Sequence, residues 1–331
     1  MRTNRVLISF PVLTVLLLLL LIVHLNSGSV NLPFGELLNA LFRFEPDNSN
    51  HILAVEFRIP RAAMAILSGA GLSVCGMLMQ TLFRNPLAGP YILGINSGAS
   101  LAVATGILSG TAFLHSDVGI IGLSLTGAFL SGLLILGISG YVRSNVSLLL
   151  IGIMIGSFIS ALTALIQSVS TAESIKNFMM WGLGSLQMTE FQQLPVIGGV
   201  FAIGLMLTLT VTRALNALVL GEDAARSLGI RVKRIRLMLI VITALLAGLI
   251  TAFCGPIAFV GMAIPNLTRM FLKTQDHRKL LWANVLAGAG FMLFCDILCM
   301  SAERMVHIPI NVITSLIGAP FIVYIIFRRL A

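Results

Sequence analysis

The chain has 331 residues, of which 57% are hydrophobic and only 10% are charged. Its mean hydropathy of +1.01 excludes an ordinary soluble domain and predicts an integral membrane protein. The net charge of +9 does not indicate nucleic-acid binding, because no basic domain with interleaved aromatic residues accompanies it.

Ten apolar runs follow one another along the chain, separated by short charged or Gly- and Pro-rich breaks. A bilayer core requires about 20 apolar residues per helix. The expected spans are 7–25, 61–82, 91–109, 118–141, 147–168, 194–213, 236–254, 257–272, 278–301 and 309–328. The first run has the basic start of a secretory signal, but its length favours a retained helix. The sequence therefore predicts an all-α polytopic membrane protein, with residues 1–331 forming one transmembrane domain.

The basic residues indicate the orientation of these spans. With the N-terminus inside, five of the 21 basic residues fall outside, which leaves sixteen on the cytoplasmic side. Basic residues accumulate on the cytoplasmic side of bacterial membrane proteins. We therefore expect ten spans with both termini cytoplasmic, in a bacterial cytoplasmic (inner) membrane. The outer five are Arg43, Arg58, Arg61, Lys176 and Arg304.

The sequence contains no motif that predicts a metal site or a nucleotide site. Its five histidines are scattered without metal-ligand spacing. The phosphate-binding pattern GxxxxGK[ST] does not occur, so no nucleotide is expected on this chain. Neither a disulfide nor a metal site is expected from the cysteines, which all fall in apolar runs without paired spacing: Cys75, Cys254, Cys295 and Cys299.

The cytoplasmic segment 213–236 has the pattern of an amphipathic helix. Glu222 and Asp223 lie in its middle, and Gly229 follows as a glycine past a helix C-terminus does. A helix lying on the membrane is one alternative, but acidic residues facing anionic lipid would be unfavourable. We therefore interpret it as a helix that docks a partner protein. Its apolar face comprises Leu215, Leu218, Leu220, Ala224, Ala225 and Leu228.

From about residue 58 to the C-terminus, a series of segments resembles the FecCD family of permease subunits in bacterial ABC importers for iron chelates, haem and cobalamin. The resemblance implies two copies of a ten-helix permease, two ABC ATPase subunits below and an extracytoplasmic substrate-binding protein above. No cofactor is then expected on this chain, since ATP and Mg belong to the ATPase. The segments are RIPR at 58–61, Gln80, RNPLAGPYILGINSGA at 84–99, WGLGSL at 181–186, LNALVLGEDAARSLGI at 215–230, CGPIAFVGMAIPNLTR at 254–269 and INVITSLIGAPF at 310–321.

The same resemblance implies roles at the cytoplasmic face. Residues 215–229 would be the coupling helix seated in the ATPase. Two loops would close a central path lined by the fifth helices of two copies, although ordinary turn chemistry is the alternative for each loop. The gate residues would be Asn85, Leu87, Asn145 and Val146, and the coupling residues Leu215, Leu218, Leu220, Gly221, Glu222, Ala225, Leu228 and Gly229.

On the outer face, the resemblance implies that Arg58, Arg61 and Arg304 receive acidic residues of the binding protein. An internal pair with Glu56 or a lipid headgroup is the alternative for the first two arginines. Met300 departs from the family pattern, which commonly has Arg four residues after the aspartate matching Asp296. Asn266 departs as well, because the family usually has His there.

Asp296 is the one acid expected deep in a span, where ionisable residues are functional by default. A proton relay would use it, but no second carboxylate or histidine stands at helical spacing. A helix-to-helix hydrogen bond or a pair near the outer end is therefore favoured for it.

The sequence thus predicts a permease, not an enzyme, that homodimerises in the bilayer and passes an iron(III)-siderophore-type chelate inward, driven by ATP hydrolysed on a partner. Cobalamin and haem are the alternative cargoes. An ion- or proton-coupled secondary transporter using Asp296 and a membrane-embedded enzyme are the alternatives of another class. Only the importer requires the 213–236 segment to bind an ATPase.

Overall fold

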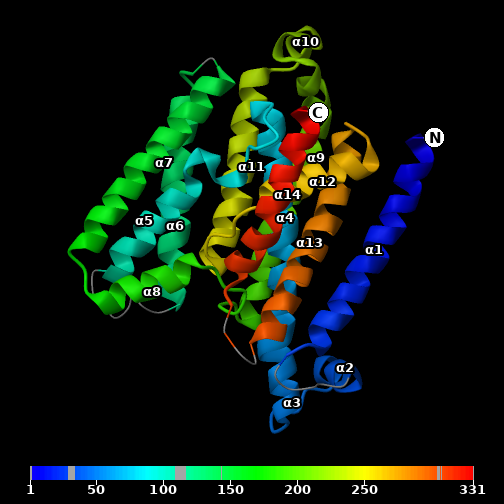
Figure 1. The fold of residues 1–331 in the computed structure, drawn as a ribbon, viewed down its shortest axis with the longest axis vertical. Helices are drawn as coiled ribbons and strands as arrows, with labels where there is room; N and C mark the ends of the chain where they lie inside the picture. Colours follow the sequence, from blue (N-terminus) through cyan, green and yellow to red (C-terminus); the bar gives the residue numbers. More distant parts are fainter. Residues whose placement is uncertain are drawn as a thin grey trace.

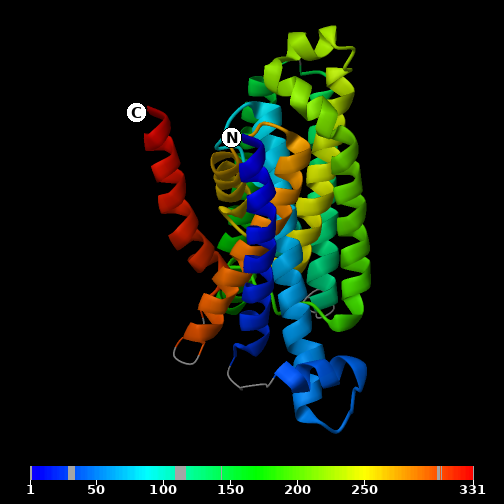
Figure 2. The same cartoon turned by 90° about the vertical axis from the view of Figure 1, so that its right-hand side faces the viewer.

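A computed structural model describes residues 2–28, 34–108, 117–142, 144–303, 306 and 308–330. These residues form helices and connections, with no strand among them. Figures 1 and 2 show one elongated bundle, in which both chain ends point toward the end that carries α10 (Glu222–Ser227). The concentration of basic residues makes this end the cytoplasmic one. The opposite, outer end carries α2 (Phe34–Phe42) and α3 (Ser49–Ile52).

Each of the ten predicted spans is a helix. Seven helical stretches of the described chain are long and apolar enough to cross a membrane, and two shorter apolar helices accompany them. Together with α12, these nine occupy the ten predicted spans: α1 (Arg2–Asn26), α4 (Ile59–Phe83), α5 (Ile95–Leu108), α6 (Asp117–Ser139), α7 (Asn145–Ser168), α9 (Leu194–Leu220), α11 (Val232–Cys254), α12 (Val260–Leu272), α13 (His277–Ala302) and α14 (Ile310–Leu330).

Two of these helices begin later than the sequence predicts. α5 begins at Ile95 instead of 91, after a 3-10 turn (Pro90–Leu93) and Gly94 at φ 71°. α12 begins at Val260 instead of 257, after Phe259 at φ 66°. Hydropathy cannot reveal such breaks, because the irregular residues are as apolar as the helices. Non-helical backbone is tolerated at this depth where it is buried in protein.

Helices also occupy connections in which the sequence predicted none. A π-helical stretch (Leu53–Arg58) joins α3 to α4 into one 35-residue helix, about 52 Å at 1.5 Å per residue, which projects beyond the bilayer. On the same outer side, α8 (Ala172–Gly182) follows α7 and a 3-10 turn (Phe191–Gln193) precedes α9.

α4 is the central helix, since nearly all of its residues are buried against α9, α11, α12 and α13. Glycines permit the closest approaches. A Cβ on Gly69 would overlap the backbone of Gly288 in α13, and one on Gly76 would overlap the backbone of Gly261 in α12. Small residues thus let backbones touch where lipid supplies no hydrophobic drive for association.

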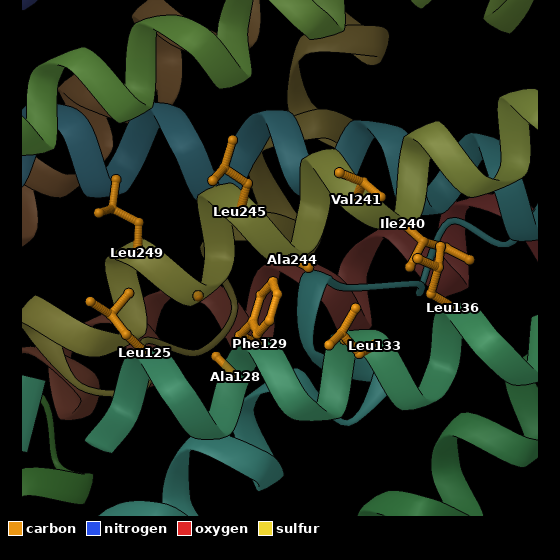
Figure 3. A pocket seen from close by; sticks show the side chains of 12 residues that line it. Leu125, Ala128, Phe129, Leu133, Leu136, Ile240, Val241, Ala244, Leu245 and Leu249 are labelled. Carbon is orange, nitrogen blue, oxygen red and sulfur yellow. The ribbon is translucent and has the colours of Figure 1, made fainter. Parts of the chain in front are cut away.

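The periphery of the bundle is apolar and open to the bilayer. Figure 3 shows a groove of about 190 Å³ between α6 and α11, with Leu125 and Leu249 at one end and Leu136 and Ile240 at the other. The residues that line it are all apolar or glycine. Such a surface is suited to hydrocarbon rather than to a polar cargo.

Candidate coupling and docking sites

The segment from Leu215 to Gly229 is not the single amphipathic helix that the sequence predicts. α9 continues to Leu220, and Gly221 at φ 126° separates it from the short helix α10. This φ favours glycine, so the chain turns here in an elbow. Leu215 and Leu218 lie on the inner side of α9, at 0% and 5% exposure. They pack in the core of the helix bundle and cannot form an external docking surface.

The most exposed apolar side chains of the elbow are Leu220 and Leu228, which are 71% and 65% exposed, while Val219 is 42% exposed. Ala225 is fully buried on the inner side of α10, and its carbonyl oxygen accepts a hydrogen bond from the N–H of Ile230. Gly229 ends the turn at φ 80°, as the sequence predicts. α10 therefore stands at the cytoplasmic tip of the bundle (Figure 1) with two exposed leucines flanking an acidic first turn.

Glu222, the first residue of α10, joins the elbow to two other helices, α7 and α11. Its Oε1 accepts hydrogen bonds from Asn145 Nδ2 at 2.7 Å and from Arg236 Nη2 at 3.3 Å. Its Oε2 accepts a hydrogen bond from Arg226 at 3.1 Å. Charge-assisted bonds of this kind are stronger than neutral ones. The elbow is thus tied to the first residue of α7 and to α11.

Asn145 extends this connection to the central helix, because its Nδ2 also donates to the Leu82 carbonyl oxygen in the last turn of α4 at 2.8 Å. The sequence-predicted gate and coupling residues meet in a hollow of about 550 Å³. Five residues of the two sets line it, namely Asn145, Val146, Leu220, Gly221 and Glu222, together with Phe83, Arg84, Ser144, Asp223 and Ala224. Asn85 and Leu87 lie in the adjoining connection after Arg84, with the Leu87 N–H donating to Asn85 Oδ1 at 2.9 Å.

At the outer end, the Arg61 side chain is bonded to partners within the helix bundle. Its Nε and Nη2 donate to the two carboxylate oxygens of Asp296 at 2.8 and 2.9 Å, and Nη2 also donates to Glu303 Oε1 at 2.8 Å. The internal partners of Arg61 are therefore Asp296 and Glu303, and not Glu56, which the sequence analysis gave as the alternative partner. Arg58 is buried and donates to the Leu25 carbonyl oxygen at 2.6 Å. Arg304 lies outside the described residues.

Asp296 links three helices. Besides Arg61 of α4, it contacts His24 of α1, whose Nε2 lies 2.7 Å from Asp296 Oδ2. Asp296 is 2% exposed, so its charge is buried and paired. The sequence analysis did not identify His24 and Glu303 as partners. His24 and Asp296, for example, are 272 positions apart in the chain, and such distant residues give no local signal of their contact. Beside this cluster opens a cleft of about 200 Å³, lined in part by Phe57, Gln187 and Met300.

The described residues hold no group of three or more His, Cys, Asp or Glu side chains that could bind a metal. All four cysteines are free thiols inside the bundle.

Comparison with known proteins decides the family. The model of the FecCD transport family matches residues 16–328. The chain belongs to the FecCD transport family. The hemin transport system permease protein HmuU of Yersinia pestis is 34% identical over 322 residues, 96% of this chain and 94% of that protein. The vitamin B12 import system permease protein BtuC of Klebsiella pneumoniae is 33% identical, covering 96% and 92%.

A third relative of this FecCD chain is the iron-uptake system permease protein FeuB of Bacillus subtilis, 31% identical over 99% of this chain and 96% of that protein. A solved inward-facing structure of a metal-chelate type ABC transporter superposes with a TM-score of 0.82 at 29% identity, covering 99% of both chains. The predicted family and the all-α permease fold are thereby confirmed. This FecCD chain is a multi-pass membrane protein of the ABC importer permease type.

Proposed function

We propose that this FecCD permease carries an iron(III)-siderophore-type chelate inward across the bacterial inner membrane, powered by ATP hydrolysed on a partner subunit. The observation that carries this proposal is the elbow of α9 and α10, which presents exposed leucines outward and is bonded through Glu222 and Asn145 to the ends of α7 and α4. A tip built in this way can pass a displacement from a bound motor into the helices beside the path.

In the proposed mechanism, two ATPase subunits bind at Leu220 and Leu228. Nucleotide binding and release then shift the population of the permease between outward-open and inward-open states. The elbow moves with the ATPase. Because Asn145 is bonded to both Glu222 and the Leu82 carbonyl oxygen, a displacement of the elbow reaches the start of α7 and the end of α4 together. The permease needs no nucleotide site of its own.

The proposed homodimer is supported by the exposed face of α7. Four residues spaced by four along α7 are between 53% and 65% exposed. Residues at this spacing form one ridge of a helix. The ridge begins at a gate residue, so facing ridges of two copies would line the path above the gate. These residues are Val146, Leu150, Met154 and Phe158.

The cargo is tested by uptake in cells that contain or lack this chain, using a ferric hydroxamate, a ferric catecholate, haem and cobalamin in turn. We expect loss of uptake for a ferric siderophore alone. Loss of haem uptake alone, or of cobalamin uptake alone, would contradict the siderophore cargo and would favour the cargo named for HmuU or BtuC. Undiminished uptake of all four would refute an import role.

Docking of the binding protein gives a prediction at Glu303. An incoming carboxylate must compete with Glu303 for Nη2 of Arg61. We expect Glu303→Gln to tighten docking up to about fivefold at low salt, the equivalent of one partly exposed ion pair. Arg61→Glu should weaken docking, and high salt should reduce both effects by screening.

The measurement is binding of the cognate binding protein to the permease in nanodiscs at two salt concentrations. Glu303→Asp serves as the matched control, because it keeps the competing charge. Docking that weakens in Glu303→Gln would mean that Glu303 supports the interface, and would contradict competition for Arg61.

A further inference from the structure

Asn266 connects two parts of the cytoplasmic half of the permease. It follows Pro265 inside α12 and is 2% exposed. Its Nδ2 donates to the Pro86 carbonyl oxygen at 2.8 Å and to the Met262 carbonyl oxygen at 2.8 Å. One side-chain amide thus joins the backbone of residues 85–88, here called the gate loop, to the backbone of α12.

The other hydrogen bonds that the structure shows for the gate loop are local. The N–H of Asn85 donates to the Gln80 carbonyl oxygen at 3.2 Å, and the N–H of Ala88 donates to the Asn85 carbonyl oxygen at 3.1 Å. Such bonds shape the loop and attach it to the end of α4. They do not attach it to α12, whereas the bond from Asn266 does.

The α12 side of this link is well anchored. The Met262 carbonyl oxygen also accepts from Gln80 Nε2 at 3.1 Å, and Gln80 Oε1 accepts from Arg269 at 2.8 Å. A Cβ on Gly89, just after the gate loop, would lie 3.1 Å from Cγ of Met262. The loop therefore packs directly on a junction of α4 and α12 that buried hydrogen bonds hold in place.

Asn266 is also one of the two departures from the family pattern, which usually has histidine here. Asparagine Nδ2 and histidine Nδ1 stand the same number of bonds from Cα, and both can donate an N–H. The buried Oδ1 of Asn266 has no hydrogen-bond partner among the described atoms. The geometry thus uses only the donor half of the amide, which is the half that a histidine can replace.

We propose that Asn266 is a positioning residue that holds the gate loop against α12, by donating a hydrogen bond to the Pro86 carbonyl oxygen. The consequence for transport rests on the proposed role of Asn85 and Leu87 in closing the path. The bond is then a contact that must break for the gate loop to leave α12.

Hydrogen–deuterium exchange of the purified permease in nanodiscs tests this proposal, and needs neither ATPase nor cargo. We compare the wild type with Asn266→Leu, which keeps the branched shape without a donor, and with Asn266→His, which keeps a donor. Exchange of the Asn85, Leu87 and Ala88 amides should rise roughly fivefold to tenfold in Asn266→Leu, as expected for one lost hydrogen bond. It should stay within about twofold of the wild type in Asn266→His.

The amides of Gly229 and Ile230, which are bonded at the far side of the elbow, serve as the internal reference and should not change. Equal exchange of the gate loop in the wild type and Asn266→Leu would overturn the proposal, and so would an equal rise in both variants. Because exchange is measured without transport, increased exchange in Asn266→Leu with normal uptake would support the tether and contradict the proposed gate instead.

Discussion

Replacing Leu220 and Leu228 together by aspartate is expected to abolish binding of the ATPase while the permease still inserts. Both side chains are more than three-fifths exposed at the cytoplasmic tip, so the fold does not depend on their packing. Buried apolar anchors at the centre of an interface contribute about 2 kcal/mol or more each. Losing two, and placing carboxylates there, should weaken binding at least a hundredfold, since 1.4 kcal/mol corresponds to tenfold.

The measurement is co-purification of the ATPase with tagged permease, quantified against permease in the membrane. Two controls separate docking from folding. Lys233→Asp changes an exposed residue at the start of α11 and should leave the ATPase bound. Leu218→Asp buries a charge in the core and should reduce the amount of permease itself. Normal co-purification with the double variant would show that the elbow is not the docking surface.

The second large effect is expected at Asp296. Replacing it by leucine leaves the guanidinium of Arg61, whose side chain is 13% exposed, without its bidentate partner and leaves His24 without its acceptor. Breaking a buried ion pair by removing one partner costs about 3–5 kcal/mol. We therefore expect a marked fall in the apparent Tm of the purified permease.

Removing both charges should be far less harmful than removing one. The double variant Asp296→Leu with Arg61→Leu leaves no uncompensated charge in the pair, so much of the lost stability should return. Equal losses in the single and double variants would contradict a structural pair. Asp296→Asn separates this role from a proton relay, because a relay requires the carboxylate itself. Uptake that persists in Asp296→Asn would exclude the relay.

The transmembrane helices could be predicted because each span is a long apolar run, and charge asymmetry orients the whole set. Their ends could not be predicted where apolar residues adopt irregular backbone, as at Gly94 and Phe259. α9 continues beyond its predicted end at residue 213, and the sequence did not reveal this for a related reason. Leu215 and Leu218 continue the buried face of α9 as it leaves the membrane. In the sequence alone, a cytoplasmic segment with such leucines looks the same as a separate amphipathic helix.

The candidate sites were predictable as segments but not as contacts. The elbow and the gate loops could be found because their residues lie in contiguous motifs. The bond from Asn145 to Glu222 joins residues 77 positions apart, and the one from Arg61 to Asp296 joins residues 235 positions apart. Such pairs form only when α7 meets α10 and α4 packs against α13, and packing geometry cannot be read from a single sequence. Asn266 shows this limit too, since the sequence reveals a departure from the family pattern but not the hydrogen bond to the Pro86 carbonyl oxygen.

The central claim is that an external ATPase moves this permease through the elbow of α9 and α10. Its most direct test is uptake of the cargo into proteoliposomes that contain the permease, the ATPase and the binding protein. Uptake should require ATP hydrolysis and should fall to background when Leu220 and Leu228 are both aspartate. Cargo accumulation at the full rate by the permease alone, driven by a proton gradient without ATPase or nucleotide, would contradict the claim.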